Sequence, residues 1–219
     1  MPPIRQMEST GRKSAPPTTI PMSSNALVGM AVTAHNNTRT CIATFASVSV
    51  NQAPLLAAIS DQTILAGRTL GVNSLASDAD VPAQTLTYSL LNSPLNATIG
   101  SNTGVFTWRP AISQSLSTQS VGVIVSDNGL SSMAATQYFT AIVNRPAQTT
   151  VSGFSVTNGQ CGFLVSGDAG PDYLILNSTN LSSWTAIATS APPVLPFWWS
   201  TTNRVQFPSQ FYRVKLGPE

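Results

Sequence analysis

The stretch from residue 51 to about 144 alternates short hydrophobic runs with turn-forming residues, and this pattern most strongly limits what the chain can fold into. Within each run, side chains two positions apart are apolar, as on one face of a strand. These positions are Leu86, Tyr88 and Leu90; Phe106 and Trp108; Val121, Val123 and Val125; and Phe139, Ala141 and Val143. Repeated short strands of this kind predict a β-sandwich.

Turn residues stand where the runs stop. The sequence is NSP at 92–94 and NTG at 102–104, and Pro110 follows shortly after Trp108. Proline cannot donate a hydrogen bond to a neighbouring strand, so it ends the run before it. The Asn and Gly at 128–129 are expected to supply the positive φ angles of a hairpin turn.

The composition also favours an all-β fold. Charged residues make up 8% of the chain, against roughly 25% in ordinary globular proteins. The two glutamates, Glu8 and Glu219, stand near the ends. Helices depend on Glu, Lys and Arg, whereas this chain is rich in Thr, Val, Ser and turn residues.

The charge distribution argues against a nucleic-acid partner, and the lengths of the apolar runs argue against a membrane-spanning helix. The net charge is +2, and the ten Lys and Arg residues are scattered along the sequence. A nucleic-acid surface needs several cations that converge on phosphates, so we expect no nucleic-acid partner. No apolar run approaches the ~20 residues of a membrane-spanning helix, so we expect no transmembrane span.

The chain divides into five expected parts. They are a disordered leader or remnant at 1–40, a strand left from a preceding repeat at 41–50, a β-sandwich at 51–145, a linker at 146–150 and a smaller β module at 151–219. Strands of the last part are expected at 154–157, 162–166, 173–177, 184–189, 197–200 and 211–216. The predicted fold is therefore all-β, with two sandwich modules.

An ordered set of motifs gives the first module a family resemblance. The motifs are NQAP at 51–54, Gly67, SDAD at 77–80, LTYSL at 86–90, TGVFTWRP at 103–110, VSDNG at 125–129 and VN at 143–144. On these residues, 51–144 resemble the cadherin-like, immunoglobulin-fold repeats of bacterial surface and secreted proteins, related to the dystroglycan-type cadherin-like domain. The resemblance implies a β-sandwich with a structural or adhesive role outside the cell.

The second module has a separate resemblance. Its shared residues are SGDAG at 166–170, Tyr173, STNL at 178–181, Trp184 and FYR at 211–213. On these, 163–218 are similar to a C-terminal module of secreted proteins of the planctomycete and verrucomicrobial type. This resemblance implies no activity.

The cadherin-like resemblance implies a calcium site at Asn51, Asp78, Asp80 and Asp127. Calcium takes six to eight oxygen ligands from carboxylates, amides and carbonyls. Three neighbouring carboxylates also repel one another unless a cation offsets their charge. The run before Asn51 holds no acidic residue, so we expect a single weak ion at most. In the other interpretation, these aspartates cap backbone amides in turns.

The sequence offers little for catalysis, and we expect no enzyme. The lone histidine, His35, lies in the expected leader, so a serine or cysteine nucleophile has no general base. Asp78 or Asp80 with Asp127 match a glycosidase carboxylate pair by number alone. Cys41 and Cys161 have no metal-site spacing; two free thiols are favoured over a bridge between them.

An aromatic cluster in the second module gives the competing functional hypothesis. In a strand, Trp198 and Trp199 point to opposite faces, so one of them is expected to face outward. We take Trp199 as the candidate ligand-facing aromatic, against the interpretation that the outward ring packs on the first module or on a proline.

Two functions follow from these features. The first is a non-catalytic, extracellular or cell-surface structural and adhesive module that binds one calcium ion. Its expected partners are a surface protein or polysaccharide and neighbouring repeats of a longer chain. The second is an accessory carbohydrate-binding region of a secreted hydrolase.

Overall fold

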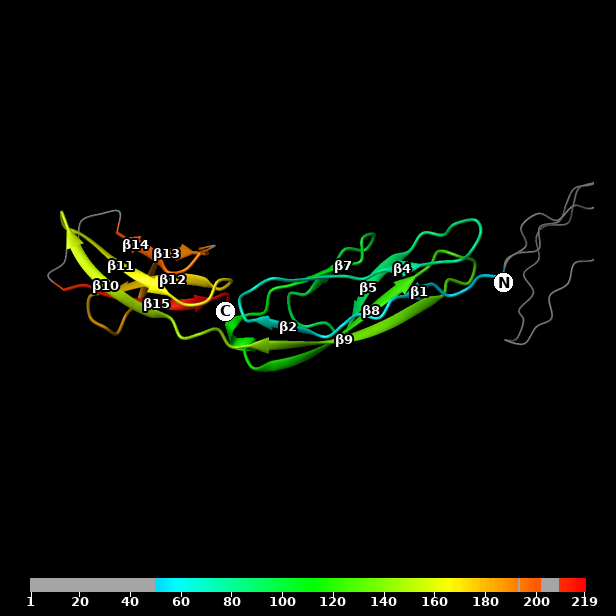
Figure 1. Ribbon diagram of the computed structural model, residues 1–219, viewed down its shortest axis with the longest axis horizontal. Helices are drawn as coiled ribbons and strands as arrows, with labels where there is room; N and C mark the ends of the chain where they lie inside the picture. The colour runs from blue at the N-terminus through cyan, green and yellow to red at the C-terminus, as the bar shows by residue number, and fades with distance from the viewer. Residues whose placement is uncertain (1–49, 193, 202–208) are drawn as a thin grey trace, which may run out of the picture. The chain divides into compact units, whose positions relative to one another are not determined.

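A computed structural model describes residues 50–192, 194–201 and 209–219, and over these residues the fold is all-β (Figure 1). Its one helical element is a single 3-10 turn, η1 (Ile112–Gln114). The all-β prediction is therefore confirmed. The predictions for 1–40 and for the strand at 41–50, up to residue 49, lie outside the described residues, as do those for His35 and Cys41.

The described chain forms two compact units. The smaller comprises residues 50–55, 76–86 and 125–135, and the larger comprises 56–75, 87–124 and the described part of 136–219. Most of the strands belong to the larger unit. The smaller unit consists mainly of the segments that connect them along the chain.

The first part of the larger unit contains the strands of an immunoglobulin-like sandwich. One sheet has the order β2-β9-β8-β5, and a second has the order β3-β7-β6. Their bounds are β2 (Gln62–Leu65), β3 (Leu70–Asn73), β5 (Thr87–Leu91), β6 (Thr98–Ile99), β7 (Val105–Trp108), β8 (Ser117–Ser126) and β9 (Ala134–Asn144). β2 runs parallel to β9, whereas β3 and β6 pair antiparallel with β7. A further short pair joins β1 (Leu55–Leu56) to β4 (Ala76–Ser77).

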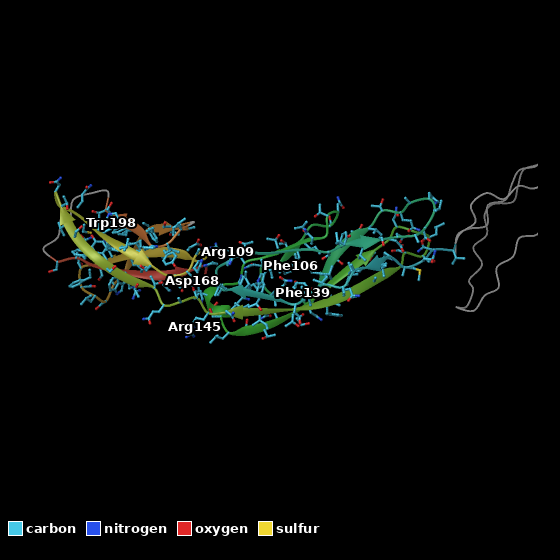
Figure 2. All side chains as sticks on the ribbon, in the orientation of Figure 1. Phe106, Arg109, Phe139, Arg145, Asp168 and Trp198 are labelled. Carbon is cyan, nitrogen blue, oxygen red and sulfur yellow. The ribbon has the colours of Figure 1, made fainter. Side chains whose placement is uncertain are left out.

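The alternating apolar residues form the core of this sandwich, as the sequence predicts. Phe106 and Trp108 are fully buried, and Phe139 is almost so. The rings of Phe106 and Phe139 meet edge to face at 5.4 Å, a favoured aromatic geometry (Figure 2). The buried indole N–H of Trp108 donates to the carbonyl of Leu95 at 3.1 Å. Trp108 is thus a satisfied core residue.

The turn at 102–104 also forms as predicted. Gly104 has a φ of +66°, and its N–H donates to the carbonyl of Gly100 at 2.8 Å. A Cβ at Gly104 would lie 2.6 Å from the carbonyl oxygen of Ser74. Only glycine suits this backbone conformation and this close approach.

The loop after β8 differs from the prediction. Neither Asn128 nor Gly129 has a positive φ; the left-handed residue of this loop is Ser131, at φ +65°. The loop is organised by a side chain instead, because the Asp127 carboxylate accepts the N–H groups of Gly129 and Met133, each at 3.0 Å. The predicted hairpin turn at Asn128 and Gly129 is therefore wrong.

Residues 150–217 contain two further sheets, β10-β11-β14 and β13-β12-β15. The strands are β10 (Thr150–Thr157), β11 (Gln160–Ser166), β12 (Asp172–Ser178), β13 (Thr185–Ser190), β14 (Phe197–Ser200) and β15 (Phe211–Gly217), each overlapping a predicted run. Their core contains Phe163, Val165, Tyr173 and Ile175. The thiol of Cys161 is buried and free.

Within the larger unit, Arg109 connects the end of β7 to the start of β12 (Figure 2). Its guanidinium donates to both carboxylate oxygens of Asp172, at 3.0 and 2.8 Å. It also donates to the carbonyls of Gly67 at 2.6 Å and Gly170 at 3.0 Å. A planar guanidinium suits such a forked contact, which fixes direction as well as distance.

Candidate functional site

The four residues of the predicted calcium site all lie in the smaller unit, outside the strands. Asn51 precedes β1, Asp78 and Asp80 follow β4, and Asp127 directly follows β8. Asp80 and Asp127 are buried, whereas Asn51 and Asp78 are half-buried. Hydrogen bonds join these residues to two glutamines, Gln52 and Gln84. We call the six residues the loop network.

Asp127 is held by backbone and side-chain donors. Its Oδ1 accepts the N–H groups of Gly129 and Met133, and its Oδ2 accepts the amide of Asn51 at 3.2 Å. Burial raises the pKa of the carboxyl, but these donors outweigh that effect and lower the pKa below its ordinary value of 3.8. Asp127 is therefore a firmly ionised carboxylate at neutral pH.

Asp80 is held in the same way by two glutamines. Its Oδ2 accepts the backbone N–H of Gln52 at 2.9 Å and the amide of Gln84 at 2.8 Å, and its Oδ1 accepts the Gln52 amide at 3.3 Å. The Gln84 amide also donates to Asn51 Oδ1 at 2.5 Å. Gln84 thereby connects the Asp80 side of the network to the Asn51 and Asp127 side.

Asp78 caps the turn that carries Asp80. Its Oδ1 accepts the backbone N–H of Asp80 at 2.8 Å, the arrangement typical of an Asx turn. Its other oxygen, Oδ2, is buried without a hydrogen-bond partner, and so is Oε1 of Gln84. The network thus presents two unsatisfied oxygens that a cation or water would satisfy.

The described segments of the smaller unit contain no cationic side chain. Asp78, Asp80 and Asp127 are the only charged residues at 50–55, 76–86 and 125–135, which gives three negative charges. Amide and backbone N–H groups offset part of the repulsion. Among the described residues, no three acidic, histidine or cysteine side chains are grouped as a metal site. A calcium ion here would therefore rely largely on amide, carbonyl or water oxygens, and such a low-charge site is weak.

The two neighbouring tryptophans of β14 do point to opposite faces, but the outward one is Trp198. Trp199 packs inward, with its ring 5.0 Å from that of Phe163 and 5.7 Å from that of Tyr212. Trp198 is 52% exposed. The assignment of Trp199 as the ligand-facing aromatic is corrected, because β14 pairs with β11 in a register that places Trp199 opposite the core residue Phe163.

Comparison with known families gives the first module its identity. Residues 51–140 match the family described as the bacterial Ig domain. This segment is a bacterial Ig domain. The cadherin-like, immunoglobulin-fold resemblance is confirmed, whereas the resemblance of the C-terminal module stays a prediction.

Solved structures with detectable similarity include cadherin ectodomains. Human CDH23 EC21-23 is 17% identical with a TM-score of 0.38, and the match covers 56% of this chain and 61% of that one. The protocadherin GammaB4 extracellular domain is 15% identical with a TM-score of 0.38, covering 57% and 32%. Mouse cadherin-23 EC22-24 is 14% identical with a TM-score of 0.35, covering 65% and 55%. The chain thus spans less than two thirds of each of these proteins. No curated protein matches it.

The bacterial Ig domain is a non-catalytic family, and its members typically lie on surface or secreted proteins. No helix in the described part of the chain is long and apolar enough to cross a membrane.

Sequence reasoning missed the glutamines of the bacterial Ig domain's loop network. Gln52 stands next to Asn51 in the NQAP motif, and Gln84 lies four residues after Asp80. Their signal was present but weak: amides close in sequence to aspartates, where no Lys or Arg balances the charge. An amide N–H is the remaining kind of side-chain donor for those carboxylates.

Proposed function

We propose that this chain is a non-catalytic structural and adhesive module of a bacterial surface or secreted protein, acting outside the cell. The observation that carries the proposal is the Arg109 contact. A structural module has to hold its strands in fixed positions. The guanidinium of Arg109 makes four hydrogen bonds between the end of β7 and the start of β12, and these supply such a connection. The bacterial Ig domain supports the extracellular setting.

Further contacts in the larger unit support the same role. The N–H of Ala147, in the segment between β9 and β10, donates to the Asp168 carboxylate at 2.6 Å. The N–H of Ile112 donates to the carbonyl of Pro218 at 2.8 Å. A Cβ at Gly67 would lie 2.8 Å from the Cα of Pro171, so backbone approaches backbone closely there. The first contact holds the connecting segment itself, and the other two join Ile112 and Gly67 to residues of the C-terminal module.

Limited proteolysis with a broad-specificity protease tests this role. Arg109→Ala is expected to speed cleavage within 145–149 several-fold, because this segment opens more easily when the hydrogen bonds of Arg109 are lost. Arg145→Ala is the matched control, since Arg145 is exposed and stands in the same segment. Equal cleavage rates for Arg109→Ala and Arg145→Ala would contradict a structural role for the fork.

We further propose that the loop network binds one calcium ion. Two observations support it: the described segments of the smaller unit carry three negative charges and no Lys or Arg, and two buried oxygens, Asp78 Oδ2 and Gln84 Oε1, have no partner. Calcium would supply charge neutralisation and a rigid connection between loops. Because amide donors already hold Asp80 and Asp127, the network can form without the ion, and the expected dissociation constant is about 10⁻⁴ to 10⁻³ M.

Melting with calcium against chelator tests this second proposal. At about ten times the dissociation constant, binding stabilises the fold by about 1.4 kcal/mol, a rise of a few degrees. Asp78→Asn should abolish the rise, whereas Asp61→Asn should keep it, since Asp61 accepts the N–H of Thr140 away from the network. An unchanged melting temperature for the wild type would reject the calcium proposal and leave the Arg109 proposal standing.

A further inference from the structure

The sheet β10-β11-β14 has one face that does not contribute to the core. Strand register sorts its residues, because directly opposed positions share a face. Phe163 pairs with Trp199 and belongs to the core side. The other side carries the rows Ser152–Leu164–Trp198 and Ser155–Gly162–Ser200, with the pairs Thr150–Ser166 and Thr157–Gln160 beyond them. We call the six residues of the two rows the Trp198 face.

The indole of Trp198 lies across this sheet. A Cβ placed on Gly162 of β11 would be 2.6 Å from Cζ2, 2.9 Å from Cε2 and 3.0 Å from Nε1 of the ring. A Cβ on Gly153 of β10 would lie 3.8 Å from Cζ3, on the other side of the ring. The ring therefore extends from β14 over β11 towards β10. Glycine at 162 is what leaves room for it.

One side of this indole remains available to a ligand. Trp198 is 52% exposed although it touches two neighbouring strands. Its N–H has no hydrogen-bond partner among the described residues. By contrast, the indole N–H of Trp108 donates to Leu95 and that of Trp184 donates to Leu181, each at 3.1 Å. Trp198 thus combines an open ring surface with a free donor.

The surroundings of the ring define the chemistry of that ligand. Strands β10, β11 and β14 contain no Asp, Glu, Lys or Arg. In the two rows, the positions around the indole are hydroxyls, at Ser152, Ser155 and Ser200, with Leu164 as the single apolar neighbour. A protein-binding patch has an apolar centre with Arg and several aromatics. Phe154 of β10 is also exposed, at 61%, and follows Gly153 directly. An exposed indole with an uncharged hydroxyl border suits a ligand with one apolar face and many hydroxyls.

We propose that the Trp198 face binds a neutral polysaccharide. A sugar ring stacks its C–H face on the open side of the Trp198 indole, and its hydroxyls exchange hydrogen bonds with the indole N–H and the serine hydroxyls. This activity goes beyond the structural role proposed above and does not depend on the Arg109 contact or on calcium.

Affinity electrophoresis of the full chain tests the proposal. The probes are hydroxyethylcellulose, galactomannan and arabinoxylan as neutral polymers, with alginate as an anionic one. At least one neutral polymer is expected to retard the wild type, and Trp198→Ala should weaken that binding about tenfold or more, as loss of a central aromatic anchor does. Trp184→Ala is the matched control and should bind like the wild type.

A second variant tests the placement of the ring without removing it. Gly162→Val would push the indole off the sheet, because a Cβ there overlaps the ring. It should therefore lose retardation while circular dichroism stays that of a folded β protein. The proposal is overturned if no neutral polymer retards the wild type, if Trp198→Ala binds as well as the wild type, or if alginate alone is bound. It is also overturned if Trp198→Ala instead converts a dimer to a monomer, because the ring would then contact a second copy.

Discussion

The loop network and the Trp198 face differ in charge and in how far their side chains are exposed to solvent. The loop network gathers three carboxylates and satisfies Asp80 and Asp127 through N–H donors from the chain itself. The Trp198 face has no charged residue on its three strands and leaves a large aromatic half exposed. The carboxylates of the loop network form hydrogen bonds mainly within the protein. The indole and the serine hydroxyls of the Trp198 face remain exposed to solvent.

This difference shows which variants separate structure from binding. Removing a donor from the loop network leaves an acceptor unsatisfied, and that costs stability. Removing Trp198 exposes backbone at Gly162 but disturbs no core contact, so it should cost binding. We therefore expect variants of the loop network to lose stability and variants of the Trp198 face to lose binding.

The largest contrast is expected between the two adjacent tryptophans. Trp199→Ala should lower the free energy of unfolding by about 3 kcal/mol, because the ring packs on Phe163 and Tyr212 in the core. Trp198→Ala should change it by less than about 1 kcal/mol. Urea denaturation of both variants measures the contrast. Similar losses for the two would show that the sheet does not have one inward and one outward indole.

A smaller loss is expected in the loop network from Gln84→Ala. This variant removes the donor shared by Asp80 Oδ2 and Asn51 Oδ1, and should cost about 1–2 kcal/mol. Gln62→Ala is the control, since that amide donates only to the nearby carbonyl of Ser60, and it should stay within about 0.5 kcal/mol. If both variants unfold alike in urea, Gln84 does not connect the network.

The smallest effect is expected from acid. The folded pKa of Asp127 lies below its ordinary value of 3.8, so its stabilisation is fully present above pH 3.8 and is lost as the pH falls through the folded pKa. The stability difference between wild type and Asp127→Asn should therefore shrink as the pH is lowered below 3.8. Unfolding followed from pH 7 to pH 2 tests this, and a difference that grows in acid would contradict the lowered pKa.

Much of the fold was predictable because alternation and turn residues act locally. Phe106, Trp108 and the valines of β8 face the core as their spacing indicates. That Asn51, Asp80 and Asp127 lie in one hydrogen-bonded network was implied by the cadherin-like resemblance and by no local pattern. The connection between the two sides of the network was not predictable, because it depends on the bond from Gln84 to Asn51, which lies 33 residues earlier in the chain.

Two other features depended on tertiary structure in the same way. The choice between Trp198 and Trp199 follows from the pairing of β14 with β11, which no local pattern specifies. The role of Arg109 depends on Asp172, 63 residues later in the chain. In the sequence, Arg109 is one residue of the TGVFTWRP motif at 103–110, and nothing in that motif indicates its partner.

Differential scanning calorimetry of the wild type, Arg109→Ala and Arg145→Ala tests the proposed structural role most directly. The wild type and Arg145→Ala should show the strands of the larger unit unfolding together in one transition. Arg109→Ala should lose about 2–3 kcal/mol of stability and split this transition, because its charged hydrogen bonds couple β7 to β12. Two transitions already present in the wild type, or an Arg109→Ala trace identical to that of Arg145→Ala, would contradict the account.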